Sequence, residues 1–265
     1  MPEKKSIKNI LLIGMAGGLA RTTFKCINKE YPNAEILGID SRDLKTKIRN
    51  KKLKFQKISY KRSAFESLFR NNVFDVVIHM GRIPSDILLD GKHEKKRLNF
   101  NILGTNLILD LCLKFKVKKV IILSTSYVYG ALDDNPAYID EEAPLRASLK
   151  YPRMIDILEM DNISSNWMWK NQNKISTIIL RPCHIIGPSV NNSIKGYLTT
   201  DYLPMPLDYN PMMQFIDEMD MANIIAKSIG KLTVGVYNVA PSEVISIKEA
   251  KQILGVKSIK IPFLV

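Results

Sequence analysis

Apolar runs of strand length alternate with stretches of helical spacing over the first 130 residues. The runs are rich in isoleucine, valine and leucine and predict buried strands at residues 8–13, 35–40, 53–58, 74–79 and 117–123. Between them, apolar residues recur every three or four positions, which predicts helices at residues 18–30, 63–69 and 101–115. Because strands that alternate with helices form parallel βαβ units with right-handed crossovers, this region predicts a parallel sheet with helices on both faces.

The pattern loosens after Gly130, where two irregular stretches separate the predicted elements. Residues 133–147 form a polar loop, and residues 187–211 have no clear period. Helices are predicted at residues 151–170, 219–229 and 247–254, and strands at 174–180 and 235–239. Because these late elements interleave with the sheet, we expect a single doubly wound parallel Rossmann α/β domain over residues 1–265. A small C-terminal annex is expected mainly from residues 187–215 and 235–265.

The composition is that of an ordinary globular protein, with 46% hydrophobic and 25% charged residues. No apolar run approaches the roughly 18 residues of a membrane span, and the N-terminal stretch lacks the apolar core of a signal peptide. Cys26, Cys112 and Cys183 are too scattered for a disulfide framework or a zinc site, and with three histidines in the chain no metal site is expected. We therefore expect a cytoplasmic protein without a membrane partner.

The chain is basic, with a formal net charge of +13. Lysine outnumbers arginine 29 to 10, which argues against nucleic-acid recognition, because arginine makes most base-edge and bidentate phosphate contacts. Nine basic residues and no acidic one lie between Lys45 and Arg62. This segment is either a solvated face or a surface for an anionic partner such as RNA, and we favour the solvated face.

Small residues cluster where the first predicted strand meets the first predicted helix. The cluster consists of Gly14, Met15, Ala16, Gly17, Gly18, Leu19 and Ala20. Glycines permit a tight turn and close backbone approach, and the start of the helix offers N–H groups to a pyrophosphate. Asp40 ends the second strand, where a carboxylate accepts both ribose hydroxyls of NAD and repels the 2′-phosphate of NADP. The pattern predicts a dinucleotide site that prefers NAD, with Arg42 as the one nearby feature that favours NADP.

Five motifs follow one another in an order typical of one enzyme family. They are GMAGGLA (14–20), DVVIHMG (75–81), NILGTNLI (101–108), LSTSYVYG (123–130) and LRPCHIIGP (180–188). With these motifs the chain resembles the extended short-chain dehydrogenase/reductase family, whose members include NAD-dependent nucleotide-sugar epimerases and dehydratases. The resemblance runs from about Lys8 to Leu254, and it implies a Rossmann fold and an NAD cofactor.

The resemblance also implies a role for each matching position. The cofactor would be held by residues 14–20 and by Asp40, Ser41, Met80, Gly81, Asn101 and Pro182. Thr125 matches the catalytic Ser/Thr, which also touches the substrate, and Tyr151 lies where the catalytic tyrosine belongs. His184 falls where relatives often place an asparagine that faces the substrate. A homodimer through the two helices that contain the asparagine and tyrosine motifs is implied as well.

Three positions depart from the family pattern. The family has Tyr-x-x-x-Lys, whereas this chain has Ile155 four residues after Tyr151. The lysine normally lowers the tyrosine pKa, and lowering it from about 10 to 7 takes roughly 4 kcal/mol. Ser59 replaces an aspartate that touches adenine, and Met213 replaces an arginine that binds substrate phosphate in nucleotide-sugar enzymes. These departures weaken the predictions of catalysis by Tyr151 and of a complete nucleotide-sugar pocket.

Three functions are therefore compatible with the sequence. The favoured one is an NAD-dependent epimerase, dehydratase or reductase that transfers a hydride at a C–OH or C=O carbon of an unidentified small molecule. Tyr151 would be its acid/base and Thr125 would orient the reacting oxygen. The alternatives are a non-catalytic NAD-binding sensor or scaffold, and an RNA-binding derivative of the same fold. Turnover, cofactor binding alone and salt-dependent RNA affinity distinguish the three.

Overall fold

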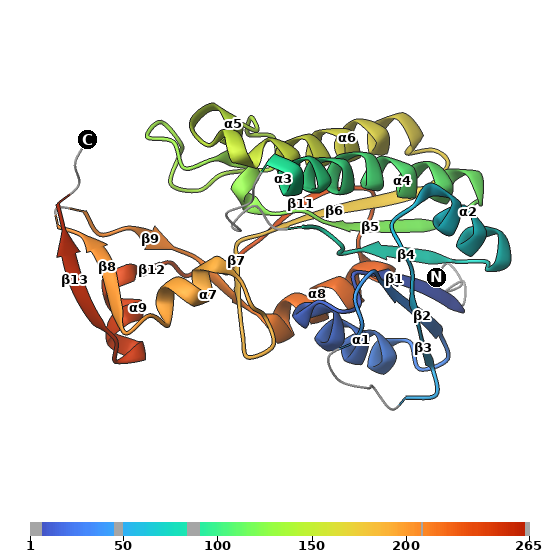
Figure 1. Cartoon of the computed structure of the whole chain (residues 1–265), viewed down its shortest axis with the longest axis horizontal. Helices are drawn as coiled ribbons and strands as arrows, with labels where there is room; N and C mark the ends of the chain where they lie inside the picture. The colour runs from blue at the N-terminus through green and yellow to red at the C-terminus, as the bar shows by residue number, and fades with distance from the viewer. Residues whose placement is uncertain (1–6, 45–49, 84–90, 208, 263–265) are drawn as a thin grey trace.

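A seven-stranded parallel sheet forms the centre of the computed structural model (Figure 1). The structure describes residues 7–44, 50–83, 91–207 and 209–262, with the backbone alone for residues 91–94. The sheet contains β1 (Asn9–Ile13), β2 (Glu35–Asp40), β3 (Leu53–Lys57), β4 (Val76–His79), β5 (Lys119–Leu123), β6 (Ser176–Pro182) and β11 (Gly235–Val239). Their order is β3-β2-β1-β4-β5-β6-β11, so the direction of winding reverses between β1 and β4. This confirms the predicted doubly wound Rossmann sheet, and the reversal marks where ligands bind in such sheets.

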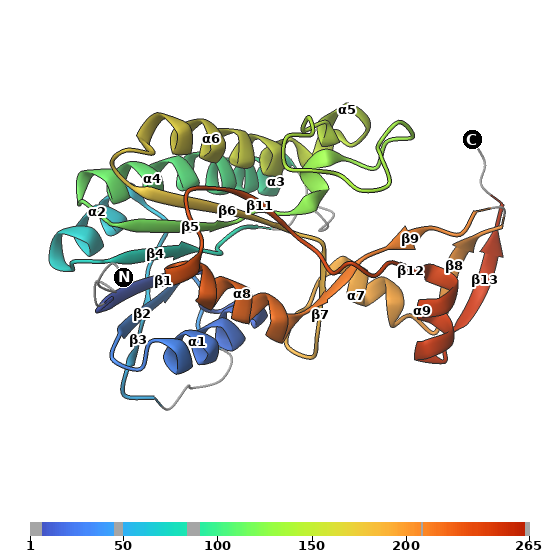
Figure 2. The same cartoon turned by 180° about the vertical axis from the view of Figure 1, so that it is seen from behind.

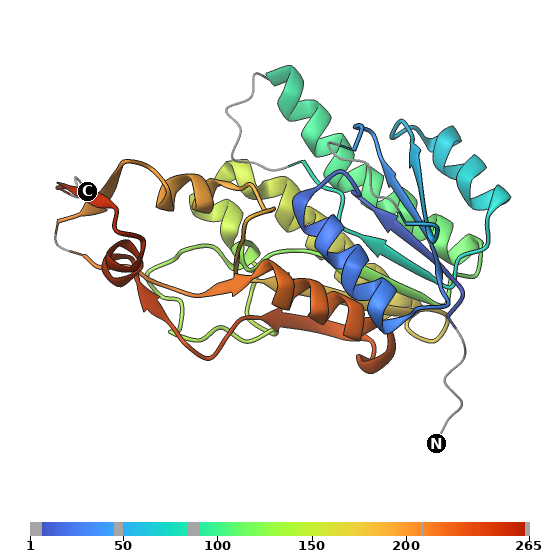
Figure 3. The same cartoon turned by 90° about the horizontal axis from the view of Figure 1, so that it is seen from below.

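Helices cover both faces of the sheet. On one face, α1 (Gly18–Glu30) and α8 (Glu218–Lys231) lie side by side although they are far apart in the sequence (Figure 3). On the other face lie α2 (Arg62–Asn71), α4 (Thr105–Lys114) and α6 (Ile155–Asn171) (Figures 1 and 2). Alternate residues of β1 enter the two cores, Ile10 and Leu12 on the α1 side and Leu11 and Ile13 on the other. Burial on both faces explains why these strands are continuous apolar runs.

Two predicted helices differ from their patterns, one in type and one in its start. The helix predicted at residues 101–115 consists of a π-helical stretch, η1 (Asn99–Gly104), followed by α4. The helix predicted at residues 151–170 begins only at Ile155, so the prediction that Tyr151 starts it was wrong. Tyr151 has φ −129° and ψ 77°, because the proline that follows disfavours the helical conformation at the preceding residue. Short helices, α3 (Gly91–Leu98), η2 (Ser126–Tyr129), α5 (Ala147–Lys150) and η3 (Pro152–Met154), complete this part of the chain.

A smaller annex extends from the carboxyl edge of the sheet, on the left of Figure 1. It contains β7 (His184–Ile186), α7 (Ser193–Leu198), β8 (Tyr202–Pro206), β9 (Met212–Met213), β10 (Phe215–Asp217), β12 (Ile245–Ser246), α9 (Ile247–Leu254) and β13 (Lys257–Ile261). The pairs β7–β10, β9–β12 and β8–β13 each form a two-stranded sheet. β11 belongs to the central sheet, so the second part of the annex begins after Val239 and not at residue 235. None of the helices in the described ranges is both long and apolar enough to cross a membrane.

Candidate functional site

The turn after β1 and the segment after β4 meet at the reversal of the sheet. Gly14 has φ +95°, a backbone conformation that favours glycine, and its N–H donates to the carbonyl of Ile39 at 2.9 Å. A Cβ on Gly14 would lie 2.8 Å from the backbone nitrogen of Gly81. The close approach of these two backbones therefore requires the glycine predicted from the sequence. Met80, beside Gly81, is half-buried at the same edge.

The start of α1 fits a pyrophosphate through its backbone. Gly17 occupies the N-cap and has no side chain with which to satisfy the first N–H groups of the helix. Gly18 and Ala16 flank it, whereas Met15, Leu19 and Ala20 pack into the core. Met15, Leu19 and Ala20, three of the seven predicted cofactor residues in this turn, therefore contribute backbone and packing. The turn as a whole offers N–H groups and the positive end of the helix dipole to an anion.

Asp40 is buried at the end of β2 and is held by its neighbours. One carboxylate oxygen accepts from the Ala16 N–H at 3.0 Å, and the other accepts from the backbone N–H and the Nε of Arg42 at 2.9 and 3.1 Å. Ser41 between them is exposed. The predicted ribose acceptor is thus fixed beside the glycine turn, and Arg42, the feature that favoured NADP, is paired with it.

Asn101 holds the backbone that follows β4. Its side chain is fully buried, donates to the carbonyl of Ile83 at 2.8 Å and accepts from the Ile83 N–H at 2.8 Å. It also donates to Asp156, which forms a buried ion pair with Arg97 at 2.8 Å. Asn101 therefore positions the segment after Gly81 from the interior of the protein, and its place among the cofactor-binding residues stays a prediction.

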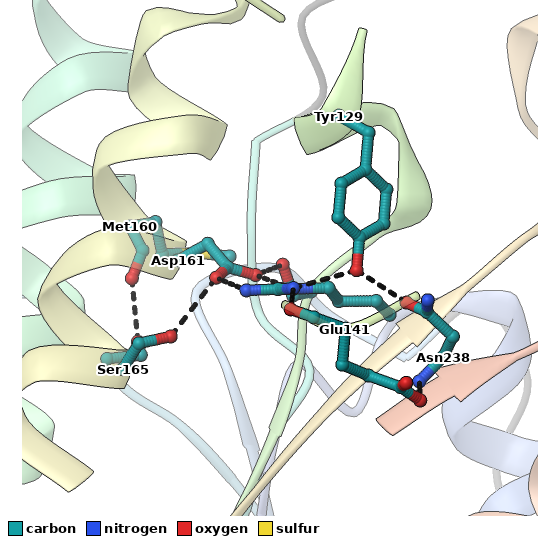
Figure 4. A network of polar contacts seen from close by, with 9 residues as sticks. Tyr129, Glu141, Met160, Asp161, Ser165 and Asn238 are labelled. Carbon is teal, nitrogen blue, oxygen red and sulfur yellow. Dashed lines mark hydrogen bonds and ion pairs between the residues drawn. The ribbon is translucent and has the colours of Figure 1, made fainter. Parts of the chain in front are cut away.

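A buried polar network joins the ends of β5 and β6 (Figure 4). Asp161 on α6 accepts hydrogen bonds from Ser124 and from Arg181, whose Nη2 lies 2.7 Å away. Arg181 also donates to the Tyr129 hydroxyl at 2.8 Å, which donates in turn to the Asn238 side chain on β11 at 2.8 Å. Because Ser124 precedes Thr125 and Arg181 precedes Pro182, the network fixes two predicted site residues at the edge of the sheet.

The polar loop of residues 133–147 is joined to this network. Glu141 accepts the Asn238 N–H at 2.7 Å, and its carbonyl accepts from Arg181 at 3.1 Å (Figure 4). The Asn238 side chain also donates to the carbonyl of Ile139 at 2.9 Å. The loop is therefore anchored on β11 at Glu141. Within the described residues, no group of three or more His, Cys, Asp or Glu side chains is arranged to hold a metal ion.

Thr125, Tyr127 and His184 lie together where β5 and β6 end. Thr125 is buried and caps η2, accepting the Tyr127 N–H at 3.4 Å. The Tyr127 hydroxyl lies 2.7 Å from Nδ1 of His184, which belongs to β7. Burial lowers the pKa of His184 from 6.5 to about 4, so the ring is neutral at pH 7, and Nδ1 accepts from the tyrosine in the tautomer that carries its proton on Nε2. Sequence reasoning found Thr125 and His184 but missed Tyr127, although its place two residues after Thr125 was a signal.

Tyr151 lies between α5 and η3 and is 43% exposed. In the described part of the chain, no hydrogen bond joins its side chain to Thr125 or to His184. Lys150 beside it is directed to Asp133 at 3.3 Å, and Ile155 begins α6. The structure therefore brings Thr125 and His184 together, and it does not join Tyr151 to them by a hydrogen bond.

Comparison with known proteins identifies relatives of the chain. The model of the NAD dependent epimerase/dehydratase family matches residues 10–240. A dTDP-D-glucose 4,6-dehydratase from Dictyostelium discoideum is 28% identical over 197 residues, which cover 69% of this chain and 45% of that protein. UDP-glucose 4-epimerase 2 from Arabidopsis thaliana is 26% identical over 223 residues, which cover 78% of this chain and 59% of the epimerase. The chain spans about half the length of the curated relatives it matches.

Solved structures share the fold. A dTDP-glucose 4,6-dehydratase from Bacillus anthracis, in complex with NAD, has a TM-score of 0.79 at 19% identity, covering 97% of this chain and 85% of that one. A UDP-glucuronic acid 4-epimerase from Bacillus cereus, in complex with UDP-glucuronic acid and NAD, has a TM-score of 0.78 at 21% identity, covering 96% and 86%. The family match extends over most of the chain and agrees with the sequence motifs: the chain belongs to the NAD-dependent epimerase/dehydratase family.

Proposed function

We propose that the chain is an NAD-dependent oxidoreductase of the epimerase/dehydratase type, acting by hydride transfer at a C–OH or C=O carbon of a small molecule of the nucleotide-sugar class. The observation that carries the proposal is the convergence of the glycine turn, Asp40 and Thr125 at the carboxyl edge of one sheet. Such an edge is where the ligands of doubly wound sheets bind. The family and the named relatives support the substrate class.

The chain's own residues fit the dinucleotide. The N–H groups at the start of α1 would take the pyrophosphate, Asp40 the adenosine ribose, and the segment Met80–Gly81 with Pro182 the path toward the nicotinamide. The chemistry that NAD supplies is the reversible acceptance of a hydride. The buried Thr125 hydroxyl would orient the oxygen of the reacting carbon. Tyr151 as the acid/base stays a prediction from the motif.

The annex favours a substrate bound without the usual phosphate clamp. Met213, which stands where the phosphate-binding arginine of nucleotide-sugar enzymes was expected, pairs with Ile245 and packs against the small core of the annex. A thioether there makes no charge-assisted hydrogen bond to a phosphate. We therefore expect the recognition of any substrate diphosphate to depend on other groups than residue 213.

Calorimetric titration with NAD and NADP tests the cofactor part of the proposal. Asp40→Ala should weaken NAD binding at least about tenfold, because it removes the acceptor for the ribose hydroxyls. Asp43→Ala is the matched control, since it removes a nearby carboxylate that pairs with Lys57 on the surface, and it should leave NAD affinity within about twofold. Failure of the wild type to bind NAD, or intact binding by Asp40→Ala, would contradict the assignment.

Substrate screening tests the catalytic part. Mixing the NAD-loaded protein with dTDP-glucose, UDP-glucose or UDP-glucuronic acid should produce the near-ultraviolet absorbance of reduced nicotinamide with at least one of them. NAD binding without any reduction by these sugars would support the sensor or scaffold alternative instead.

A further inference from the structure

We propose that Tyr127 and His184 form the acid–base pair of this site, with Tyr127 as the group that exchanges a proton with the substrate oxygen and His184 as its proton partner. The inference rests on the proposed hydride-transfer function and names the proton path that this function needs. It gives the role of the motif tyrosine to a residue that the sequence analysis did not select.

The first argument is the place of the pair in the fold. Tyr127 lies on η2, directly after β5, and His184 begins β7, directly after β6. β5 and β6 are neighbours in the parallel sheet, so both side chains start from its carboxyl edge. The Thr125 side chain accepts the Tyr127 N–H at 3.4 Å, so the tyrosine is held in the same turn as the predicted oxygen-orienting hydroxyl.

The second argument is the fixed geometry of the pair. The Tyr127 hydroxyl lies 2.7 Å from His184 Nδ1, a normal hydrogen-bond distance. The His184 ring contacts two aromatic rings, Tyr127 with centroids 5.2 Å apart and Phe215 with centroids 5.6 Å apart. Phe215 is also the residue opposite His184 in the β7–β10 pair. The imidazole is thus held from two sides, and Nδ1 keeps its direction toward the phenol.

The third argument is the chemistry that this arrangement permits. A phenol that donates one hydrogen bond still carries two lone pairs with which to accept a proton. As the hydride leaves the substrate carbon, the hydroxyl proton becomes that of a protonated carbonyl, a far stronger acid than imidazolium. That proton passes to the Tyr127 oxygen while the Tyr127 proton passes to His184 Nδ1. A lone pair of the substrate oxygen forms the C=O bond as the hydride leaves for the nicotinamide, the O–H electron pair stays on that oxygen, and the positive charge ends on the imidazole.

The pair also accounts for catalysis without Tyr151, the tyrosine at the motif position, whose surroundings are poorly suited to an acid/base. Tyr151 is 43% exposed, and the lysine that normally lowers the pKa of such a tyrosine is replaced by Ile155. A neutral Tyr127 needs no lowered pKa, because Nδ1 of His184 lies 2.7 Å from its hydroxyl and accepts its proton in the tautomer protonated at Nε2. In this chain His184 therefore takes the place of the missing lysine as the partner of the tyrosine, as the group to which Tyr127 passes its own proton when it takes up the substrate proton.

Single-turnover reduction of bound NAD, with the sugar nucleotide that proves active, compares three variants. Tyr127→Phe should slow reduction by about 10²–10⁴-fold, the usual contribution of an acid–base group. Tyr138→Phe, at a side chain that is 68% exposed, is the matched control and should keep the rate within about threefold, and NAD affinity should stay within about twofold in both. A Tyr151→Phe protein without activity, or a Tyr127→Phe protein near the wild-type rate, overturns the proposal.

The same assay in mixtures of H₂O and D₂O tests His184. Two protons move together in the relay, so the wild-type rate should depend on the deuterium fraction along a curve. In His184→Gln one proton transfer is lost, and the dependence should become a straight line at a lower rate. A straight line for the wild type would show that His184 only positions the tyrosine.

Nitrogen NMR of the three histidines separates failure of the pair from failure of the proposed function. The His184 signal, identified by its loss in His184→Gln, should show an unprotonated, hydrogen-bonded Nδ1 at pH 7. Tyr127→Phe should shift it and Tyr151→Phe should not. If no sugar nucleotide reduces NAD, the proposed function fails, and the pair is then decided by this signal: a shift supports it, and an unmoved Nδ1 resonance overturns it.

Discussion

Single buried polar residues set the geometry of the carboxyl edge. Asn101 makes hydrogen bonds to the backbone of Ile83 from the interior, and Asp161 accepts hydrogen bonds from Ser124 and Arg181. Each side chain makes hydrogen bonds to a backbone or charged group that would be buried without a partner if the side chain were removed, at a cost in free energy. Its substitution would therefore move the site although the side chain itself contacts no ligand. The residues that position this site are consequently more numerous than those the family motifs mark.

His79 provides a test of how burial controls charge. It is buried at the end of β4, its Nε2 lies 3.0 Å from the Thr105 hydroxyl, and burial lowers its pKa from 6.5 to about 4. The unfolded chain therefore takes up the proton first as the pH falls. The stabilisation by the neutral ring is present in full above pH 6.5 and is lost as the pH falls toward about 4.

The wild type should thus lose about 2 kcal/mol from this residue between about pH 7.5 and about pH 5. His79→Gln keeps a hydrogen-bonding side chain near Thr105 but does not titrate, and it should lack this loss. Urea unfolding at the two pH values gives the free energies of unfolding. Equal losses in the two proteins would show that His79 is not held neutral.

At the scale of elements, the strands of the central sheet were predicted from the sequence more accurately than the helices and the annex around it. Strands buried on both faces are apolar runs whose ends can be read from the sequence. The helix predicted at residues 247–254 has the bounds of α9, and the structure shows that a capping box of Ser246 and Glu249 fixes its start. The start of α6 was predicted four residues too early, because helical spacing does not show that Pro152 disfavours the helical conformation at Tyr151. α7 and β8 have too few residues for a period to emerge. The Tyr127–His184 contact joins residues 57 positions apart, which no local pattern reports.

The link between α6 and the sheet is expected to carry a large share of stability. Asp161→Ala would leave the buried Arg181 guanidinium without its carboxylate, at a cost of about 3–5 kcal/mol. Asp133→Ala is the control, because its carboxylate is 95% exposed beside Lys150 and its removal should have no measurable effect. Chemical unfolding measures both. A change of less than about 1 kcal/mol in Asp161→Ala would contradict a structural role for the pair.

The basic segment around β3 is expected to bind RNA only weakly. Lys45, Lys47 and Arg49 lie outside the described residues. Of the remaining cations, Lys54 pairs with Glu35 at 3.1 Å and Lys57 pairs with Asp43 at 2.6 Å.

The aromatic residues of this segment give little support to RNA binding. The Tyr60 ring contacts the Phe100 ring, with centroids 4.0 Å apart and the ring planes tilted by 53°. This contact removes one of the two aromatic rings of the segment, Phe55 and Tyr60, from base stacking.

Fluorescence anisotropy with single-stranded RNA at about 150 mM salt measures this affinity. We expect dissociation constants above the micromolar range, with log affinity falling by about 0.7 per contacted phosphate per log unit of salt. Submicromolar binding that disappears when Lys51, Lys52 and Lys54 become glutamate would instead favour the RNA-binding function.

At the scale of the whole molecule, the described residues form a large core on the two faces of the sheet and smaller separate clusters, one of which lies in the annex. The annex core contains Ile194, Leu198, Leu203, Ile247 and Ala250. Its β8–β13 sheet has two parallel strands and leaves Tyr202, Ile259 and Ile261 about half exposed. Isolated two-stranded sheets are marginal in water. The annex is therefore the least stable part of the described structure on physical grounds, and the single-domain organisation stays a prediction.

Hydrogen exchange tests that organisation. Amides of β8 and β13 should exchange at least about tenfold faster than those of β1 and β4, through local opening of the annex. A single denaturant transition for the main sheet should accompany this. Equal protection in both parts would show that the annex unfolds only with the whole domain. The homodimer implied by the family resemblance also stays a prediction, and light scattering distinguishes one chain from two.

The packing of α8 on α1 has a consequence for synthesis on the ribosome. α1 and the β1 face bearing Ile10 and Leu12 emerge first, but the helix that completes their cover ends at Lys231. At 5–20 residues per second, the interval between the end of α1 and the end of α8 is about 10–40 s. Over that interval the nascent chain presents an incompletely covered apolar face. Chaperones that bind such faces should hold chains stalled before residue 218 and release those that have passed Lys231.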